Sequence, residues 1–203
     1  MKRIFLVRHG QTDFNLRGIV QGSGVDASLN ETGKAQAQAF YENFRSVPFD
    51  KVYISTLKRT AESVARFFEF TPFEKYTELN EISWGELEGK EVNHQRREQM
   101  KELVNAWNNG DFDLAAKNGE SPNQVAKRQK QFIPIITRRP EEKNILICSH
   151  GRAMRIFLCV LLGLPLEQMD RFAHQNLCLY ELSFTNSSGF ELIRENYTGH
   201  LQT

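Results

Sequence analysis

Two short apolar runs, far apart in the chain, each end in a histidine followed by a glycine. The first, Ile4 to Val7, precedes Arg8-His9-Gly10, and the second, Ile145 to Cys148, precedes Ser149-His150-Gly151. Runs of this length, bounded at once by turn residues, are typical of buried strands. Open α/β sheets bind ligands at the carboxyl ends of their strands. We therefore expect both histidines at one edge of a sheet, although a histidine satisfied by a backbone partner would give either pattern alone.

The second run leads into an apolar segment, Ala153 to Leu162, that predicts a largely buried helix. Helix N-termini carry free N–H groups and a partial positive charge, which suits an anion. If His9 and His150 are adjacent in space, they face one anionic group.

A third apolar run, Val52 to Ile54, ends at Ser55-Thr56 and is followed by helical spacing through Phe70. Ser55 or Thr56 is expected to cap that helix. Arg59 lies in its first turn, where the helix dipole disfavours a cation. Its position is explained if an anion binds there, because a guanidinium makes bidentate contacts with phosphate or carboxylate.

The remaining periodicity predicts strands that alternate with helices, and hence a mainly parallel sheet with helices on both faces. The expected elements are a helix from the cap Asn30 to Phe44, an edge strand at Thr77–Leu79, a helix over Glu91–Trp107, a helix started by Ser121-Pro122 and kinked or ended by Pro134, and a hairpin of Leu177–Phe184 with Phe190–Arg194.

In the order of its motifs, the chain resembles the histidine phosphatase superfamily, in its phosphoglycerate mutase-like branch (branch 1). The matching segments are Leu6 to Thr12 with Asn15, Gln21-Gly22, Asp26 to Leu29, Gly33 with Gln36-Ala37, Ser55 to Ala61, Leu79-Asn80-Glu81, Gly85, Glu88-Gly89 and Ser149-His150-Gly151. The chain departs from the family pattern at Gln11, at Ala27-Ser28 and at Leu87, which leaves the substrate preference open.

The resemblance implies a three-layer α/β/α sandwich in one domain, residues 1–203, with a small helical cap at about residues 82–118. Phosphoryl transfer needs an in-line nucleophile, stabilisation of the equatorial oxygens and a proton for the leaving oxygen. We assign the nucleophile to His9, which becomes a phosphohistidine. The resemblance singles out Glu81 as the proton donor, whereas Glu78, Glu86 and Glu88 are interpreted as solvated surface residues.

The phosphate oxygens are expected to contact a set of cationic, amide and glycine positions. Those positions are Arg8, Asn15, Gln21, Gly22, Arg59, His150 and Gly151, of which Arg8, Arg59 and His150 also count as catalytic. Ile19, Phe14 and Trp84 are candidates for contact with the organic part of the substrate. His94, His174 and His200 are interpreted as structural or surface residues.

The composition excludes several other classes of protein. Lys and Arg number 26 against 25 Asp and Glu, so no bulk charge indicates a nucleic acid or a membrane surface as partner. Three cysteines lie in apolar surroundings without metal-ligand spacing and are expected to be buried thiols. Lys2-Arg3, followed at once by a strand, argues against a signal peptide, so we expect a cytoplasmic protein. A homodimer stays open.

The expected activity is metal-independent and cofactor-independent hydrolysis of small phosphomonoesters. A phosphoglycerate mutase uses the same phosphohistidine, but this chain is shorter than the mutases it resembles, which favours a phosphatase. A phospho-ligand binding module without catalysis is the alternative from another class, and the presence of Arg8, His9, Arg59, Glu81 and His150 together counts against it. A metal site built from His9, Glu81 and His150 is a further rival, which the flanking arginines disfavour.

Overall fold

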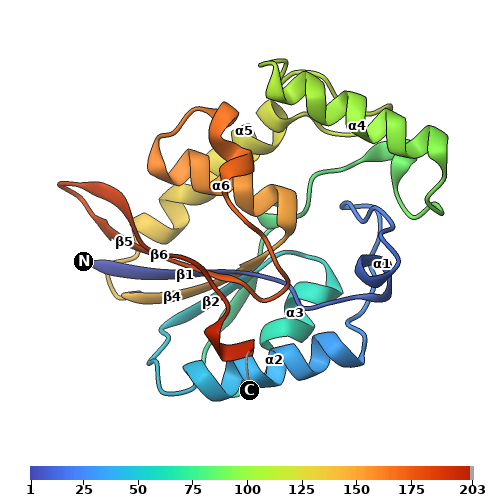
Figure 1. The fold of residues 1–203 in the computed structure, drawn as a ribbon. Helices are drawn as coiled ribbons and strands as arrows, with labels where there is room; N and C mark the ends of the chain where they lie inside the picture. Colours follow the sequence, from blue (N-terminus) through green and yellow to red (C-terminus); the bar gives the residue numbers. More distant parts are fainter. Residues whose placement is uncertain (202–203) are drawn as a thin grey trace.

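A six-stranded sheet forms the centre of the molecule in the computed structural model, which describes residues 1–201 (Figure 1). Its strands run in the order β3-β2-β4-β1-β5-β6. Their bounds are Lys2–Arg8 for β1, Lys51–Ile54 for β2, Phe73–Lys75 for β3, Asn144–Ser149 for β4, Leu179–Thr185 for β5 and Gly189–Tyr197 for β6. The first four are parallel, and β5 runs antiparallel to both β1 and β6. This confirms the predicted α/β class with a mainly parallel sheet and a terminal hairpin.

Helices cover both faces of the sheet. Helices α5 (Pro122–Thr137) and α6 (Gly151–Leu162) lie on one face, and α2 (Glu31–Phe44) and α3 (Lys58–Val64) on the other (Figure 1). Side chains alternate along β1, so that Ile4 and Leu6 pack under α5 and α6 while Phe5 and Val7 pack under α2 and α3. Because these two cores bury the sheet on both faces, its strands are near-continuous apolar runs.

The helix ends follow the predicted caps in two of three places. The Asn30 side chain accepts from the Gly33 N–H at the start of α2, and Ser121 forms a capping box with Gln124 at the start of α5. At α3 the prediction was wrong, because Leu57 occupies the cap position and its side chain makes no capping hydrogen bond. The N–H of Lys58 instead donates to a carboxylate oxygen of Asp26 at 2.7 Å.

The early end of a helix at Pro134 and the strand at Thr77–Leu79 were predicted wrongly. Helix α5 continues through Pro134 to Thr137, because buried Phe132 and Ile136 hold its last turn against the core. The edge strand is Phe73–Lys75, and the predicted strand Thr77–Leu79 is a 3₁₀ turn. Carbonyl groups of that turn accept from the Arg128 guanidinium, so its hydrogen bonds go to a side chain and not to a neighbouring strand.

The segment of residues 82–118 lies beside the carboxyl ends of the strands and contains α4 (His94–Asn108) (Figure 1). Leu103 and Trp107 on α4 are buried, and the Trp107 ring lies 5.3 Å from that of Trp84. The segment therefore packs on the core that contains α5 and α6 and has no separate core of its own among the described residues.

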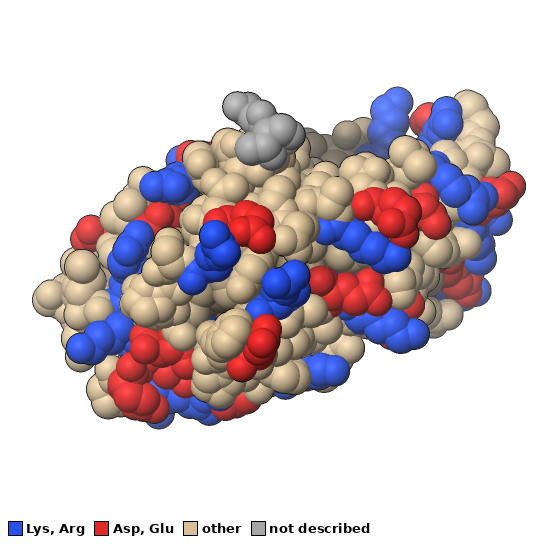
Figure 2. All heavy atoms as spheres, turned by 90° about the horizontal axis from the view of Figure 1, so that it is seen from below, with Lys and Arg blue, Asp and Glu red and all other residues tan. Residues whose placement is uncertain are grey.

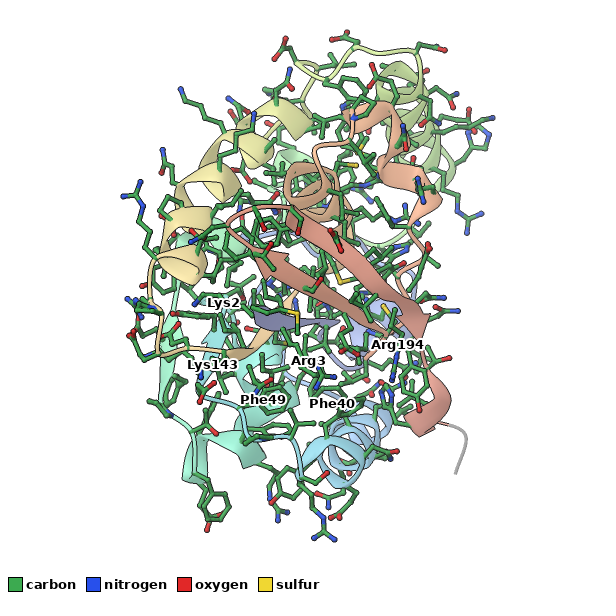
Figure 3. The ribbon with its side chains drawn as sticks, turned by 90° about the vertical axis from the view of Figure 1, so that its left-hand side faces the viewer. Lys2, Arg3, Phe40, Phe49, Lys143 and Arg194 are labelled. Carbon is green, nitrogen blue, oxygen red and sulfur yellow. The ribbon has the colours of Figure 1, made fainter. Side chains whose placement is uncertain are left out.

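The side of the sheet where the parallel strands begin carries a different set of contacts. Figure 3 views this side, where Lys2 and Arg3 lie at the start of β1 near Lys143. The ammonium of Lys2 donates to the carbonyl groups of Arg139 and Glu142.

On the face seen in Figure 2, basic and acidic side chains are interspersed. No helix within residues 1–201 combines the length and the apolar character needed to cross a membrane.

Candidate active site

Adjacent strand ends bring the two His-Gly turns together. Strands β1 and β4 pair in parallel with Arg8 opposite Ser149, and the His9 N–H donates to the Ser149 carbonyl at 3.0 Å. The ring centroids of His9 and His150 lie 5.2 Å apart, and both side chains are buried. The expectation that the two histidines lie together at one sheet edge is confirmed.

The His9 ring is held with one nitrogen open. Its Nδ1 lies 2.7 Å from the Gly10 carbonyl oxygen. Since a carbonyl only accepts, Nδ1 carries the proton and Nε2 carries the lone pair in the neutral ring. Burial, together with the cations Arg8 and Arg59, holds the pKa of His9 well below its usual value. The ring is therefore neutral at pH 7, the form in which Nε2 is a nucleophile.

The guanidinium of Arg59 is fully buried behind these rings. Its Nε donates to His150 Nδ1 at 3.1 Å, so Nε2 of His150 carries the proton and donates to Ser55 Oγ at 2.8 Å. Burial and the neighbouring Arg59 charge hold the pKa of His150 well below its usual value. Burial also lowers the pKa of Arg59 to about 10, which leaves it cationic at neutral pH.

The carboxylate of Glu81 lies at the N-terminus of α6. Its Oε1 accepts from the N–H groups of Ala153 at 2.7 Å and Ile82 at 2.9 Å, and its Oε2 accepts from the N–H of Arg152 at 3.1 Å. These donors include free N–H groups of the first helical turn, which the macrodipole makes favourable partners for an anion. The buried carboxylate is thus fixed in position by three backbone groups.

A cavity of about 350 Å³, called here the His9 cavity, opens at these strand ends. Of the predicted site residues, it is lined by Arg8, His9, Asn15, Gln21, Glu81 and Gly151, and of the candidates for substrate contact by Ile19 and Trp84. The wall of the cavity does not include Arg59, His150 or Gly22. These three residues are joined behind the wall by hydrogen bonds of the Arg59 guanidinium. Phe14 is also absent from the wall.

Donors and acceptors in this wall retain hydrogen-bonding capacity. Within residues 1–201, Arg8 Nε and Gln21 Oε1 are buried without a hydrogen-bond partner. Another nitrogen of Arg8 donates to the His174 carbonyl, which fixes its guanidinium. Such an uncompensated buried donor is costly unless a ligand accepts from it. The wall is therefore suited to an anion.

Several residues of the site were not found from the sequence. Asn176 donates through Nδ2 to the His9 carbonyl at 3.0 Å and to Asn15 Oδ1 at 3.3 Å, and His174 and Arg152 line the His9 cavity. Burial and neighbouring arginines lower the pKa of His174 to about 3, so it is neutral there. The position of Arg152, directly after Gly151, was the one available signal.

Glu88 is not the solvated residue that was predicted. Its Oε1 accepts from the Trp84 N–H at 2.7 Å and its Oε2 from the Gly24 N–H at 2.8 Å. The loop that it holds supplies the carbonyl groups of Gly22 and Val25, which accept from the Arg59 guanidinium. Glu88 therefore fixes the loop that positions Arg59. The motif match of Glu88-Gly89 was the available signal, and it was outweighed because a glutamate in a charged segment is usually solvated.

The other two histidines have no part in the cavity wall. His94 is exposed at the start of α4. His200 is buried against the rings of Phe40, Phe44 and Tyr197. Across residues 1–201, no group of three or more His, Cys, Asp or Glu side chains is arranged to hold a metal ion. The three cysteines are buried and free of disulfides.

A family model described as the histidine phosphatase superfamily (branch 1) matches residues 4–198. The chain belongs to this superfamily. A Schizosaccharomyces pombe protein described as a probable phosphatase is 31% identical over 206 residues, which cover 99% of this chain and 91% of that protein. The adenosylcobalamin/alpha-ribazole phosphatase of Escherichia coli K12 is 30% identical over 181 residues, 87% of each chain.

Solved structures share the fold over almost the whole chain. The alpha-ribazole phosphatase from Shigella flexneri superposes with a TM-score of 0.83 at 28% identity, covering 96% of each chain. Bacillus stearothermophilus YhfR superposes with a TM-score of 0.86 over 100% of both chains at 23% identity, a likeness that speaks for the fold alone. The predicted family and fold are thus confirmed.

Proposed function

We propose that this protein hydrolyses small phosphomonoesters through a phosphohistidine on His9, with Glu81 as the acid and base. The observation that carries the proposal is the fixed tautomer of His9, which leaves Nε2 free in a cavity shared with Arg8 and Glu81. The names of the relatives support the reaction class, because several are phosphatases of small phosphorylated metabolites.

The first half of the reaction forms a bond between His9 Nε2 and phosphorus and breaks the bond from phosphorus to the leaving oxygen. Protonated Glu81 gives its proton to that oxygen. Its Oε2, which accepts the longest of the three backbone hydrogen bonds, is the oxygen suited to carry this proton. The leaving group departs as an alcohol, and Glu81 becomes the carboxylate that the helix N-terminus stabilises.

The second half returns the enzyme to its starting state. Glu81 takes a proton from water, whose oxygen attacks phosphorus as the bond to Nε2 breaks, and inorganic phosphate is released. Arg8 donates to the phosphoryl oxygens from the cavity wall, and Arg59 adds its charge from behind His150. Positioned cations of this kind supply most of the stabilisation in phosphoryl transfer. Asn15, Gln21 and the Gly151 backbone complete the phosphate pocket, and residues 82–118 act as its cap.

The test is a rapid-quench experiment with a ³²P-labelled ester and alkaline denaturation. We expect an acid-labile adduct in the wild type, no adduct and no turnover with His9→Ala, and both retained with His94→Ala, a matched change at an exposed histidine. Turnover by His9→Ala at the wild-type rate would refute the assignment of the nucleophile. With 3-phosphoglycerate, an isomer that appears faster than free phosphate would show a mutase.

A further inference from the structure

A second hollow, called here the α4 groove, lies between α4 and the chain that follows α1 (Asp13–Leu16). Its volume is about 350 Å³, and its apolar wall consists of Val20, Leu87, Val92, Met100 and Val104. It shares Gly18, Val20, Met100 and Val104 with the wall of the His9 cavity. The two hollows are therefore adjoining parts of one trough, which runs from the nucleophile out along α4.

The apolar side chains of this groove are in contact with solvent. Val92 is 37% exposed, and Leu87, Met100 and Val104 are only partly buried against the core. When an apolar group covers apolar surface that is gathered in a hollow, the free energy of the system falls. Because the hollow opens from the reaction site, the group in reach is the organic part of a bound ester.

The rim of the groove is cationic. Lys90, Arg96, Arg97 and Lys101 line it, and within residues 1–201 no aspartate or glutamate does. Lys101 lies 3.8 Å from the carboxylate of Glu98.

The other charges near the rim leave two cations free. Arg96 donates to the carbonyl of Glu91, whose carboxylate pairs with Arg17 at 2.7 Å. Among the described residues, the side chains of Lys90 and Arg97 have no hydrogen-bond or ion-pair partner. Two cations are thus available to an anion at the outer end of the groove.

We infer, on the basis of the hydrolase function proposed above, that the substrate's leaving group occupies the α4 groove. The structure then assigns the class of ester: an apolar chain or ring system joined to the phosphate, with a second anionic group such as a carboxylate at its far end. The apolar body lies along Val20, Met100 and Val104, and the terminal anion lies near Lys90 and Arg97. A short polar ester reaches neither feature.

Four synthetic primary alkyl phosphates of nearly equal intrinsic reactivity test this inference: ethyl phosphate, octyl phosphate, and octyl phosphates with a terminal carboxylate or a terminal ammonium. Phosphate release gives kcat/KM for each. Since a buried methylene is worth about fourfold, we expect octyl phosphate to exceed ethyl phosphate by at least about tenfold. The terminal carboxylate should add about threefold or more at low salt, and the terminal ammonium should lower the value.

Two substitutions separate the apolar wall from the rim. Val92→Glu should reduce the ratio of octyl to ethyl phosphate, and Arg97→Glu should remove or invert the preference for the terminal carboxylate over the terminal ammonium. Lys130→Glu makes the same change of charge at an exposed position of α5 and should leave both ratios as in the wild type.

The outcomes distinguish the two proposals. Phosphate release from all four esters with equal kcat/KM would overturn the assignment of the groove and leave the hydrolase function standing. No phosphate release from any ester would overturn the hydrolase function and the substrate class with it. A chain-length preference unchanged by Val92→Glu would show that the apolar body binds elsewhere.

Discussion

The neutral, buried histidines at the strand ends make the stability of the fold depend on pH. The pKa values of His9 and His150 are held well below the ordinary 6.5 by burial and by the neighbouring arginines. As pH falls below 6.5, the unfolded chain takes up a proton at each position and the folded chain does not. Stability is therefore present in full above that pH and is lost as the pH falls.

The size of the loss follows from the proton uptake. At pH 5.5, about ten in eleven unfolded chains carry the proton at one such histidine, which lowers the free energy of unfolding by about 1.4 kcal/mol. His9 and His150 together give about twice that value. His150→Gln removes one contribution and keeps both hydrogen bonds, because an amide can accept from Arg59 Nε and donate to Ser55 Oγ.

Urea unfolding at pH 7.5 and pH 5.5, followed by tryptophan fluorescence, measures the difference. Between these two values of pH, His150→Gln should lose about 1.4 kcal/mol less than the wild type, with the urea slope unchanged. His94→Gln, at an exposed position, should lose as much as the wild type. Equal losses for His150→Gln and the wild type would mean that the folded protein holds His150 charged, contrary to the reasoning above.

Three further substitutions test the site. Glu81→Gln should lower kcat by about 10²–10⁴ for an alkyl phosphate but much less for p-nitrophenyl phosphate, whose leaving group departs without a proton; equal losses would contradict the acid role. Glu88→Ala should lower kcat/KM by about tenfold through displacement of Arg59, and unchanged kinetics would show that the loop holds without it. Gly33→Ala places a Cβ on the Gln11 carbonyl oxygen, so the urea midpoint should fall by the equivalent of about 2 kcal/mol, and an unchanged midpoint would show that the turn can shift freely.

The strand ends that carry His9 and His150 could be predicted because their signals are local. Short apolar runs, each closed by a histidine and a glycine, indicate both the strand and the turn that ends it. The hairpin near Gly189 and the cap at Ser121 were predicted for the same reason. Glu81, in contrast, stood out from its neighbours only by the motif match, since nothing in Glu78 to Glu88 alone shows which carboxylate meets a helix N-terminus.

The missed features depend on contacts between distant segments. Asn176 reaches His9 because β5 pairs with β1, and Glu88 meets Gly24 because two loops pack together. Pro134 shows the reverse case, in which local chemistry predicts a break and burial of the neighbouring side chains overrides it. The cap expected at Ser55 failed because its hydroxyl bonds with His150 and Thr60.

The central place of β1 has a consequence for synthesis of the protein. The strand that leads to His9 leaves the ribosome well before its two neighbours in the sheet, because β4 begins at Asn144 and β5 at Leu179. Its hydrogen bonds must wait for pairings that are distant in sequence and slow to form. Until then an apolar strand with two open edges is exposed, which is the kind of segment that invites association between nascent chains. In a truncated chain that ends before β4, His9 therefore lacks both strands that flank β1 in the sheet.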